Sequence, residues 1–306
     1  MGRSRTVRLT FDVDVPEPDD RGDAIALWLP LPASTPQQEV LGMAIDSTVP
    51  VSVHHDAVYG NPMLHARTDG LGAGRLHVAY EARVRRHEWV IDVNQRQEPP
   101  APQDLGFFAA QLGETRKVRF LPEIVGVADE IRSNSTDALN IARAAYDHVL
   151  ATMTYDKTGD GWGSGDTEWA CSAGRGNCTD FHTLFLAILR CCGVACEFEI
   201  GVAFPPGTEG GDITHYKCGY HCWVRFHVPG LGWVPADVSE ASRHPEQREY
   251  FFGAIDEDRV LLSRGRDIVL APASRGEPEN FFTEPRLEKH SGAGVIYRKK
   301  LEFSSV

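Results

Sequence analysis

The segment of the chain richest in chemistry places a cysteine at the expected start of a buried helix. Cys178 lies in GRGNCTDFHTLFLAILRCCG (residues 174–193), where Asn177 is a suitable N-cap and Gly193 follows the apolar repeat as a stop signal. At the start of a helix, free N–H groups and the positive end of the helix dipole stabilise a thiolate, which lowers the pKa of the thiol. The same N–H groups can stabilise an oxyanion on an attacked carbonyl. We therefore predict Cys178 to be a nucleophile, although most cysteines are buried and inert.

A histidine and an aspartate follow the cysteine on an expected β-hairpin. GYHCWVRFHV (219–228) predicts a strand with His221 near its start, and GWVPAD (232–237) runs back after a Pro-Gly turn to Asp237. Cysteine, histidine and aspartate in this order supply a nucleophile, a base and a group that orients the base. A five-residue loop over 227–231 would put His221 directly opposite Asp237, whereas a four-residue loop would put them on opposite faces. The triad therefore predicts the five-residue register, or a bulge that restores it.

These residues predict cysteine-dependent acyl transfer. The Cys178 thiolate would attack an amide or thioester carbonyl, His221 would protonate the leaving amine, and Asp237 would fix the tautomer of the imidazole. Release of the acyl group to water gives hydrolysis, and release to a second amine gives transamidation; we favour hydrolysis because nothing marks an amine site. The expected partner is a peptide, protein or small amide substrate, with no cofactor and no metal. Further candidates are Asn177, Trp169 and His182 as supports of the oxyanion or the triad, and Trp223 and Trp233 as lining of the substrate cleft.

Composition excludes several other classes of protein. The 306 residues are 42% hydrophobic and carry a net charge of −12, which argues against disorder and against nucleic acid as a partner. No apolar run approaches the roughly 18 residues of a membrane-spanning helix, and the N-terminus has no apolar signal-peptide core, so we expect no membrane contact. The seven cysteines crowd into one third of the chain, unlike a secreted disulfide scaffold. We therefore expect a cytoplasmic protein; its oligomeric state is not indicated.

The elements that must position the candidate residues begin with a strand-rich region. Residues 7–15 alternate apolar and polar side chains with period two, and similar short runs recur up to about residue 86 between turn residues. QEPPAPQD (97–104) is polar and proline-rich, as expected of a linker. The predicted organisation is an N-terminal antiparallel β-sandwich domain (1–100), a linker (101–118) and a catalytic domain (119–306).

Helical periodicity replaces the strand pattern after the linker. The spacing predicts helices over 122–131 and 136–153, with Thr136 as the cap of the second. The last fifty residues return to strand-like runs. Because helices and strands are segregated, the predicted fold class is α+β.

Three ordered motifs carry a resemblance to a known family. GNCTDFHTLFLAILRCCG, HCWVRF and GWVPAD resemble the motif blocks of the transglutaminase-like superfamily, over about residues 135–240. The resemblance implies a papain-like cysteine-protease core in which Cys178, His221 and Asp237 are nucleophile, base and carboxylate. YFFGAIDEDRVLLSRGRDIVL (250–270) is similar to sequence that follows this core in bacterial members, which implies a bacterial protein.

Three alternatives remain open at this stage. The cysteines and histidines between Cys178 and Cys222 could bind zinc, although their spacings differ from usual zinc sites. The acidic loop from Asp156 to Ser164 resembles the first part of an EF-hand, but position twelve is Thr167. A non-catalytic module, in which the β-domain binds a partner, is the third alternative.

Overall fold

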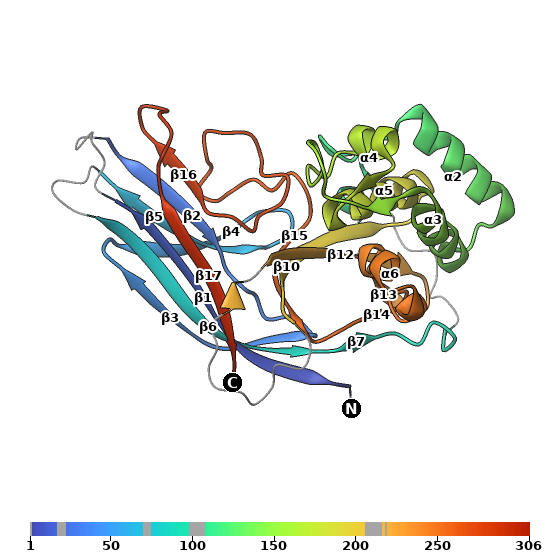
Figure 1. Cartoon of the computed structure of the whole chain (residues 1–306), viewed down its shortest axis with the longest axis horizontal. Coiled ribbons are helices and arrows are strands. Elements are labelled where there is room, and N and C mark those ends of the chain that lie inside the picture. Colours follow the sequence, from blue (N-terminus) through green and yellow to red (C-terminus); the bar gives the residue numbers. More distant parts are fainter. Residues whose placement is uncertain (1, 17–22, 70–74, 98–107, 206–215, 218) are drawn as a thin grey trace.

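The computed structural model describes residues 2–16, 23–69, 75–97, 108–205, 216–217 and 219–306. A strand-rich half contains both chain termini at one edge, and a helical half lies beside it (Figure 1). Strands β10 and β12 extend from the strand-rich half to the helices. The predicted α+β class, with its strand-rich N-terminal part, is confirmed.

The strands and helices have the following bounds. The strands are β1 (Ser4–Val15), β2 (Ile25–Pro30), β3 (Gln38–Ser47), β4 (Val51–His55), β5 (Pro62–Thr68), β6 (Leu76–His87), β7 (Trp89–Val90), β8 (Thr154–Tyr155), β9 (Arg175–Gly176), β10 (Cys196–Ala203), β11 (Tyr216–Lys217), β12 (Gly219–Val228), β13 (Gly232–Ala236), β14 (Ala254–Ile255), β15 (Arg259–Arg264), β16 (Arg286–Lys289) and β17 (Arg298–Ser305). The helices are α1 (Ala109–Leu112), α2 (Pro122–Asn134), α3 (Ala138–Thr152), α4 (Thr167–Ala173), α5 (Cys178–Cys191) and α6 (Val238–Arg243), with a 3-10 turn η2 (Pro245–Gln247).

Two antiparallel sheets form the strand-rich half, in the orders β11-β17-β1-β6-β3 and β16-β2-β5-β4. Their apolar faces share one core, because alternate residues of β1 and β6 point into it, as the period-two pattern predicts. Phe11 and Tyr80 are examples, with 0% and 1% of their surface exposed.

The end of the chain completes both sheets. β17 pairs along β1, from Val7 opposite Ser305 to Asp14 opposite Arg298, and β16 pairs with β2. The sequence assigned these last strands to the catalytic domain, because sequence order alone does not reveal pairing between distant strands. The domain bounds stay a prediction. The strand pairing shows in addition that both ends of the chain contribute strands to the strand-rich half.

The helices pack on one another and on β12 around a second apolar core. The two expected helices are α2 and α3, and α3 is capped by Asp137, whose carboxylate accepts from the N–H groups of Leu139 and Asn140, rather than by Thr136 as predicted. Helix α5 runs through the centre of this core, and its residues from Cys178 to Arg190 are all buried. The sheet β13-β12-β10-β15 lies against α5 and extends into the core of the strand-rich half through Val202 and Val260.

Candidate active site

The start of α5 is built to present Cys178 at the first helical position. The Asn177 side chain accepts from the Thr179 N–H at 3.0 Å, and Asp180 accepts from the Asn177 N–H at 3.0 Å, which completes a capping box. Gly176 precedes the cap at a φ of +156°, and a Cβ there would lie 2.3 Å from an Asp180 carboxylate oxygen. The helix therefore begins where the sequence predicts.

The hairpin brings His221 and Asp237 together by a register that differs from the predicted one. Val228 pairs with Gly232, so the loop has three residues rather than five, and Asp237 follows the end of β13 as the N-cap of α6. The predicted five-residue loop is wrong. The two registers differ by two residues, which equals the side-chain period, so the two side chains still share a face. His221 Nε2 lies 2.6 Å from Asp237 Oδ2, diagonally across the hairpin.

Cys178 and His221 stabilise each other in their charged forms. A hydrogen bond from the Cys222 thiol is the largest influence on the pKa of Cys178, and a hydrogen bond and the positive charge of His221 add to it, so that this pKa lies well below its usual range despite burial. Burial alone would lower the pKa of His221, but the Asp237 carboxylate and the contact with Cys178 outweigh it and raise that pKa to about 10. Both shifts favour the form of the pair in which the thiol is ionised and the imidazole is protonated.

Asp237 is buried, and its carboxylate accepts hydrogen bonds from other donors besides His221. Its Oδ1 accepts from Ser239 Oγ and from the Glu240 N–H, each at 2.9 Å, and its Oδ2 accepts from Arg259 Nη1 at 2.9 Å. Burial disfavours its charge, but His221 and its other donors hold the pKa of Asp237 well below the usual range. The contact of Arg259, on β15, with Asp237 was not predicted. Its only signal in the sequence is that a charged residue interrupts the mostly apolar run DRVLLS.

His182 and Cys222 form a second connection between Cys178 and Asp237. The His182 ring is fully buried, with Nδ1 3.3 Å from Cys222 Sγ and Nε2 3.4 Å from Asp237 Oδ1, although the latter pair lacks hydrogen-bond geometry. Burial is the largest influence that raises the pKa of Cys222 well above its usual range, which keeps this thiol protonated as the donor to Cys178. His182 was predicted as a support of the triad, whereas Cys222 was not.

None of the three tryptophans of the predicted site lines the cavity that includes His221. Trp169 packs over the glycine-rich loop, where a Cβ on Gly161 would lie 2.2 Å from its Nε1. Trp223 is fully buried and donates from Nε1 to Glu199 Oε2 at 2.5 Å, with its ring 6.4 Å from that of His221. Trp233 pairs with His227 at the far end of the hairpin. Trp223 shares a face of β12 with His221 but packs into a buried cluster with Trp89, Ile255 and Leu261, and neither hairpin tryptophan lines a cavity at His221.

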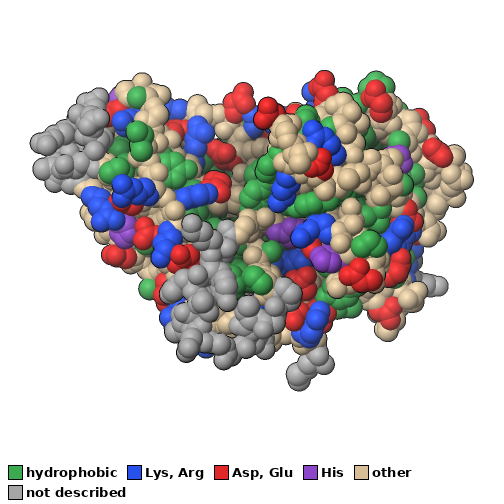
Figure 2. Space-filling model, viewed as in Figure 1, with side chains coloured by type: hydrophobic (Ala, Val, Ile, Leu, Met, Phe, Trp, Pro, Cys, Tyr) green, Lys and Arg blue, Asp and Glu red, His purple; other side chains and the backbone are tan. Residues whose placement is uncertain are grey.

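The cavity beside the triad is lined by other residues. A space of about 420 Å³ opens at His221, and its lining includes Arg243, Gln247, Arg3 and Phe204. Acidic and basic side chains are interspersed over the face drawn in Figure 2. The cavity gives solvent a route to the imidazole.

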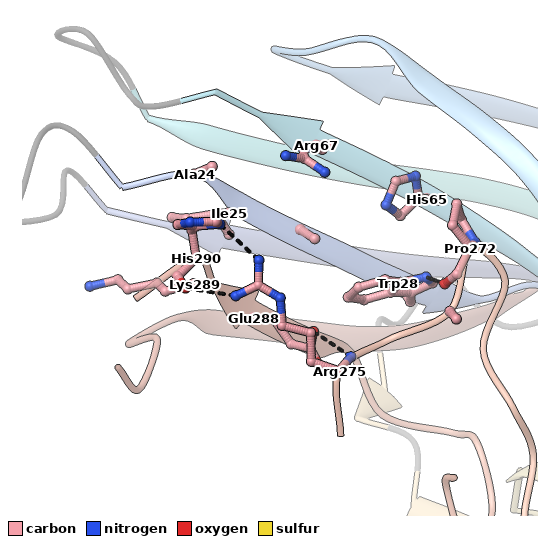
Figure 3. Close-up of a pocket in the computed structure, with 12 residues that line it drawn as sticks. Ala24, Ile25, Trp28, His65, Arg67, Pro272, Arg275, Glu288, Lys289 and His290 are labelled. Atoms are coloured by element: carbon pink, nitrogen blue, oxygen red, sulfur yellow. Dashed lines mark hydrogen bonds between the residues drawn. The ribbon is translucent and has the colours of Figure 1, made fainter. Parts of the chain in front are cut away.

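A second cavity lies on the outer face of the strand-rich half, away from the triad. It encloses about 160 Å³ above β2, β5 and β16 (Figure 3). Trp28 Nε1 donates to the Pro272 carbonyl at 2.9 Å, and Arg275 Nη1 donates to the His290 carbonyl at 2.6 Å. None of the residues lining it belongs to the predicted site.

Several residues of the two metal hypotheses have other partners. The described residues hold no group of three or more His, Cys, Asp or Glu side chains that could share a metal ion. The six described cysteines are free, and Cys192 and Cys196 donate to backbone carbonyls; Cys218 lies outside the described residues. In the acidic loop, Asp156 pairs with Arg175 at 3.1 Å.

Comparison with known proteins identifies the core. Residues 125–238 match the transglutaminase-like superfamily. A relative from Haemophilus influenzae, named as an uncharacterized protein, is 25% identical over 91% of this chain and 84% of its own length. The crystal structure of a "putative cysteine protease" from Cytophaga hutchinsonii has the same fold over 99% of this chain and 98% of its own, with a TM-score of 0.62 and 13% identity. The periplasmic domain of TgpA from Pseudomonas aeruginosa is 18% identical over 79% of this chain and 90% of its own, with a TM-score of 0.37. Within the described residues, no helix has the length and apolar character needed to cross a membrane.

Proposed function

Because residues 125–238 form a transglutaminase-like core, we propose that this protein is an enzyme that transfers acyl groups from amide carbonyls through Cys178, and that its main reaction is hydrolysis of a peptide or amide bond. The observation that carries the proposal is the arrangement of one buried thiol, one imidazole and one carboxylate. His221 lies 2.6 Å from Asp237 and near enough to Cys178 for each group to shift the pKa of the other. We further propose a reducing, cytoplasmic setting, because a thiolate nucleophile must stay reduced.

The reaction proceeds in two halves through a thioester. A sulfur lone pair of Cys178 forms a bond to the carbonyl carbon, and the carbonyl π electrons move onto oxygen. As the tetrahedral intermediate collapses, the C–N bond breaks and His221 gives its proton to the leaving amine, while Asp237 holds the ring. The neutral imidazole then takes a proton from water, which attacks the thioester and returns the thiolate as the acid leaves.

Access of water to the base favours hydrolysis over transamidation. The cavity of about 420 Å³ includes His221 in its wall, so a water molecule can approach the same imidazole that must deprotonate it. The second candidate is transamidation from a protein glutamine or a carrier-bound thioester. It requires a site that excludes water and orients an amine.

Acylation with an activated ester tests the nucleophile. We expect p-nitrophenyl acetate to acetylate Cys178 in the wild type, as read by intact mass and peptide mapping, and to leave Cys178→Ala unmodified. Cys171→Ala is the matched control, because Cys171 is a half-buried cysteine whose pKa burial raises to about 11. Acetylation spread over several cysteines, or unchanged peptide cleavage by Cys178→Ala, would contradict the proposal.

The fate of the acyl group tests the second half-reaction. The acetylated enzyme is offered water with and without glycinamide, and free acetate and N-acetylglycinamide are measured. Hydrolysis predicts mainly acetate in both mixtures. Mainly N-acetylglycinamide would establish transamidation in its place.

A further inference from the structure

Asn177 and Tyr220, which directly precede Cys178 and His221, are joined by a hydrogen bond. Asn177 Nδ2 donates to Tyr220 Oη at 2.6 Å. The amide orientation follows from its other contact, since Asn177 Oδ1 accepts from the Thr179 N–H at 3.0 Å. Because Tyr220 Oη is an acceptor in this bond, its own proton remains available for another acceptor.

The Tyr220 hydroxyl is held beside the start of α5, on a partly exposed residue. The residue is 38% exposed, its ring is stacked 6.4 Å from that of Phe281, and a Cβ on Gly163 would lie 3.3 Å from Oη. Burial, and next the negative charge of Cys178, raise the pKa of Tyr220 to about 12, so the hydroxyl keeps its proton at neutral pH. A substrate that reaches the cysteine therefore meets a fixed O–H donor.

The helix start supplies a second donor. The Thr179 N–H bonds to the Asn177 side chain, and the N–H groups of Asp180 and Phe181 bond to the Asn177 carbonyl. In the part of the chain that the structure describes, the Cys178 N–H has no hydrogen-bond partner. An oxygen above the sulfur can thus accept from this backbone group.

We propose that Tyr220 is a catalytic residue whose hydroxyl, together with the Cys178 N–H, forms the oxyanion hole. This inference rests on the proposed function. When the Cys178–carbon bond forms, the negative charge that develops on the carbonyl oxygen accepts one hydrogen bond from each donor. Both bonds are released when the C=O double bond returns and the amine leaves with the His221 proton. Asn177 is a positioning residue that fixes the tyrosine.

Two reagents separate oxyanion stabilisation from thiolate reactivity. Acylation by p-nitrophenyl acetate passes through an oxyanion, whereas alkylation by iodoacetamide does not. We expect Tyr220→Phe to lower the acylation rate of Cys178 by about 100-fold, as loss of one oxyanion donor does in other enzymes. Its alkylation rate and the pH profile of alkylation should stay within about threefold of the wild type.

Two further variants complete the test. Asn177→Ser keeps a helix N-cap but removes the amide donor, so acylation should fall while α5 and alkylation are retained. Tyr155→Phe is the matched control, since Tyr155 also lies near the Cys178 charge but, within the described part of the chain, makes no hydrogen bond to Asn177, and it should acylate normally. Equal loss of acylation and alkylation in Tyr220→Phe, no loss of either, or a loss confined to Tyr155→Phe would each overturn the role of Tyr220. A wild type that alkylates but never acylates would overturn the proposed function itself and this role with it.

Discussion

Lowering the pH should distinguish Cys178 from the other cysteines of the chain. Burial raises the pKa values of Cys171 and Cys192 to about 11, so their thiolate fractions fall tenfold for each unit of pH below that value. Between pH 9 and pH 6 their alkylation should therefore slow by about 1000-fold. Cys178, with a pKa held well below the usual range by Cys222 and His221, should slow by less than about tenfold.

The assay compares each cysteine with itself, so differences in exposure cancel. Iodoacetamide is applied at several pH values, and the labelled fraction of each cysteine is followed by peptide mass spectrometry. His221→Gln removes the imidazolium, and in this variant Cys178 should regain part of the pH dependence of an ordinary thiol. A tenfold fall per pH unit at Cys178 in the wild type would show that the sulfur is not ionised and would refute the thiolate–imidazolium pair.

Three other predictions follow from the same structure. A raised pKa keeps His221 protonated as the general acid, so peptide cleavage should decline only as the pH rises through about 10; a decline centred near 7 would contradict this assignment. Arg259→Gln removes a buried partner of Asp237 and should lower the free energy of unfolding by about 3 kcal/mol in urea titrations, whereas a loss below about 1 kcal/mol would mean that the pair contributes little. Gly201→Ala would place a Cβ 1.8 Å from a β15 carbonyl and should cost about 3 kcal/mol or more, while Gly42→Ala, with no atom within 4 Å of its Cβ, should be nearly neutral in thermal melts.

Local signals predicted the elements that carry the candidate site. The start of α5 could be read from the sequence because a cap, a capping box and an apolar repeat act within a few residues of one another. The shared face of His221 and Asp237 could be predicted because it depends only on the parity of the register, even though the loop length was wrong. The assignment of catalytic roles to these residues stays a prediction.

Contacts between distant segments could not be predicted in the same way. Arg259 lies on β15, and α6, η2 and β14 separate this strand from Asp237 in the sequence. No local sequence pattern indicates such a distant partner. Trp223 was predicted to line the cleft, yet it is fully buried in a cluster with Trp89, Ile255 and Leu261, which come from segments distant in the sequence. The Tyr220 hydroxyl was missed because its place depends on how the hairpin meets α5.

The strand-rich half supports the candidate site through the segment that carries Arg259. Gln38, at the start of β3, is fully buried and bonds to both the N–H and the carbonyl of Leu261, two residues beyond Arg259. Arg5, on β1, pairs with Asp258 at 2.5 Å, directly before Arg259. A buried ion pair stabilises only where its geometry is held, because desolvation of both charges opposes it. The N-terminal strands therefore do more than precede the transglutaminase-like core, since they fix the backbone from which the Arg259 guanidinium holds the Asp237 carboxylate beside His221.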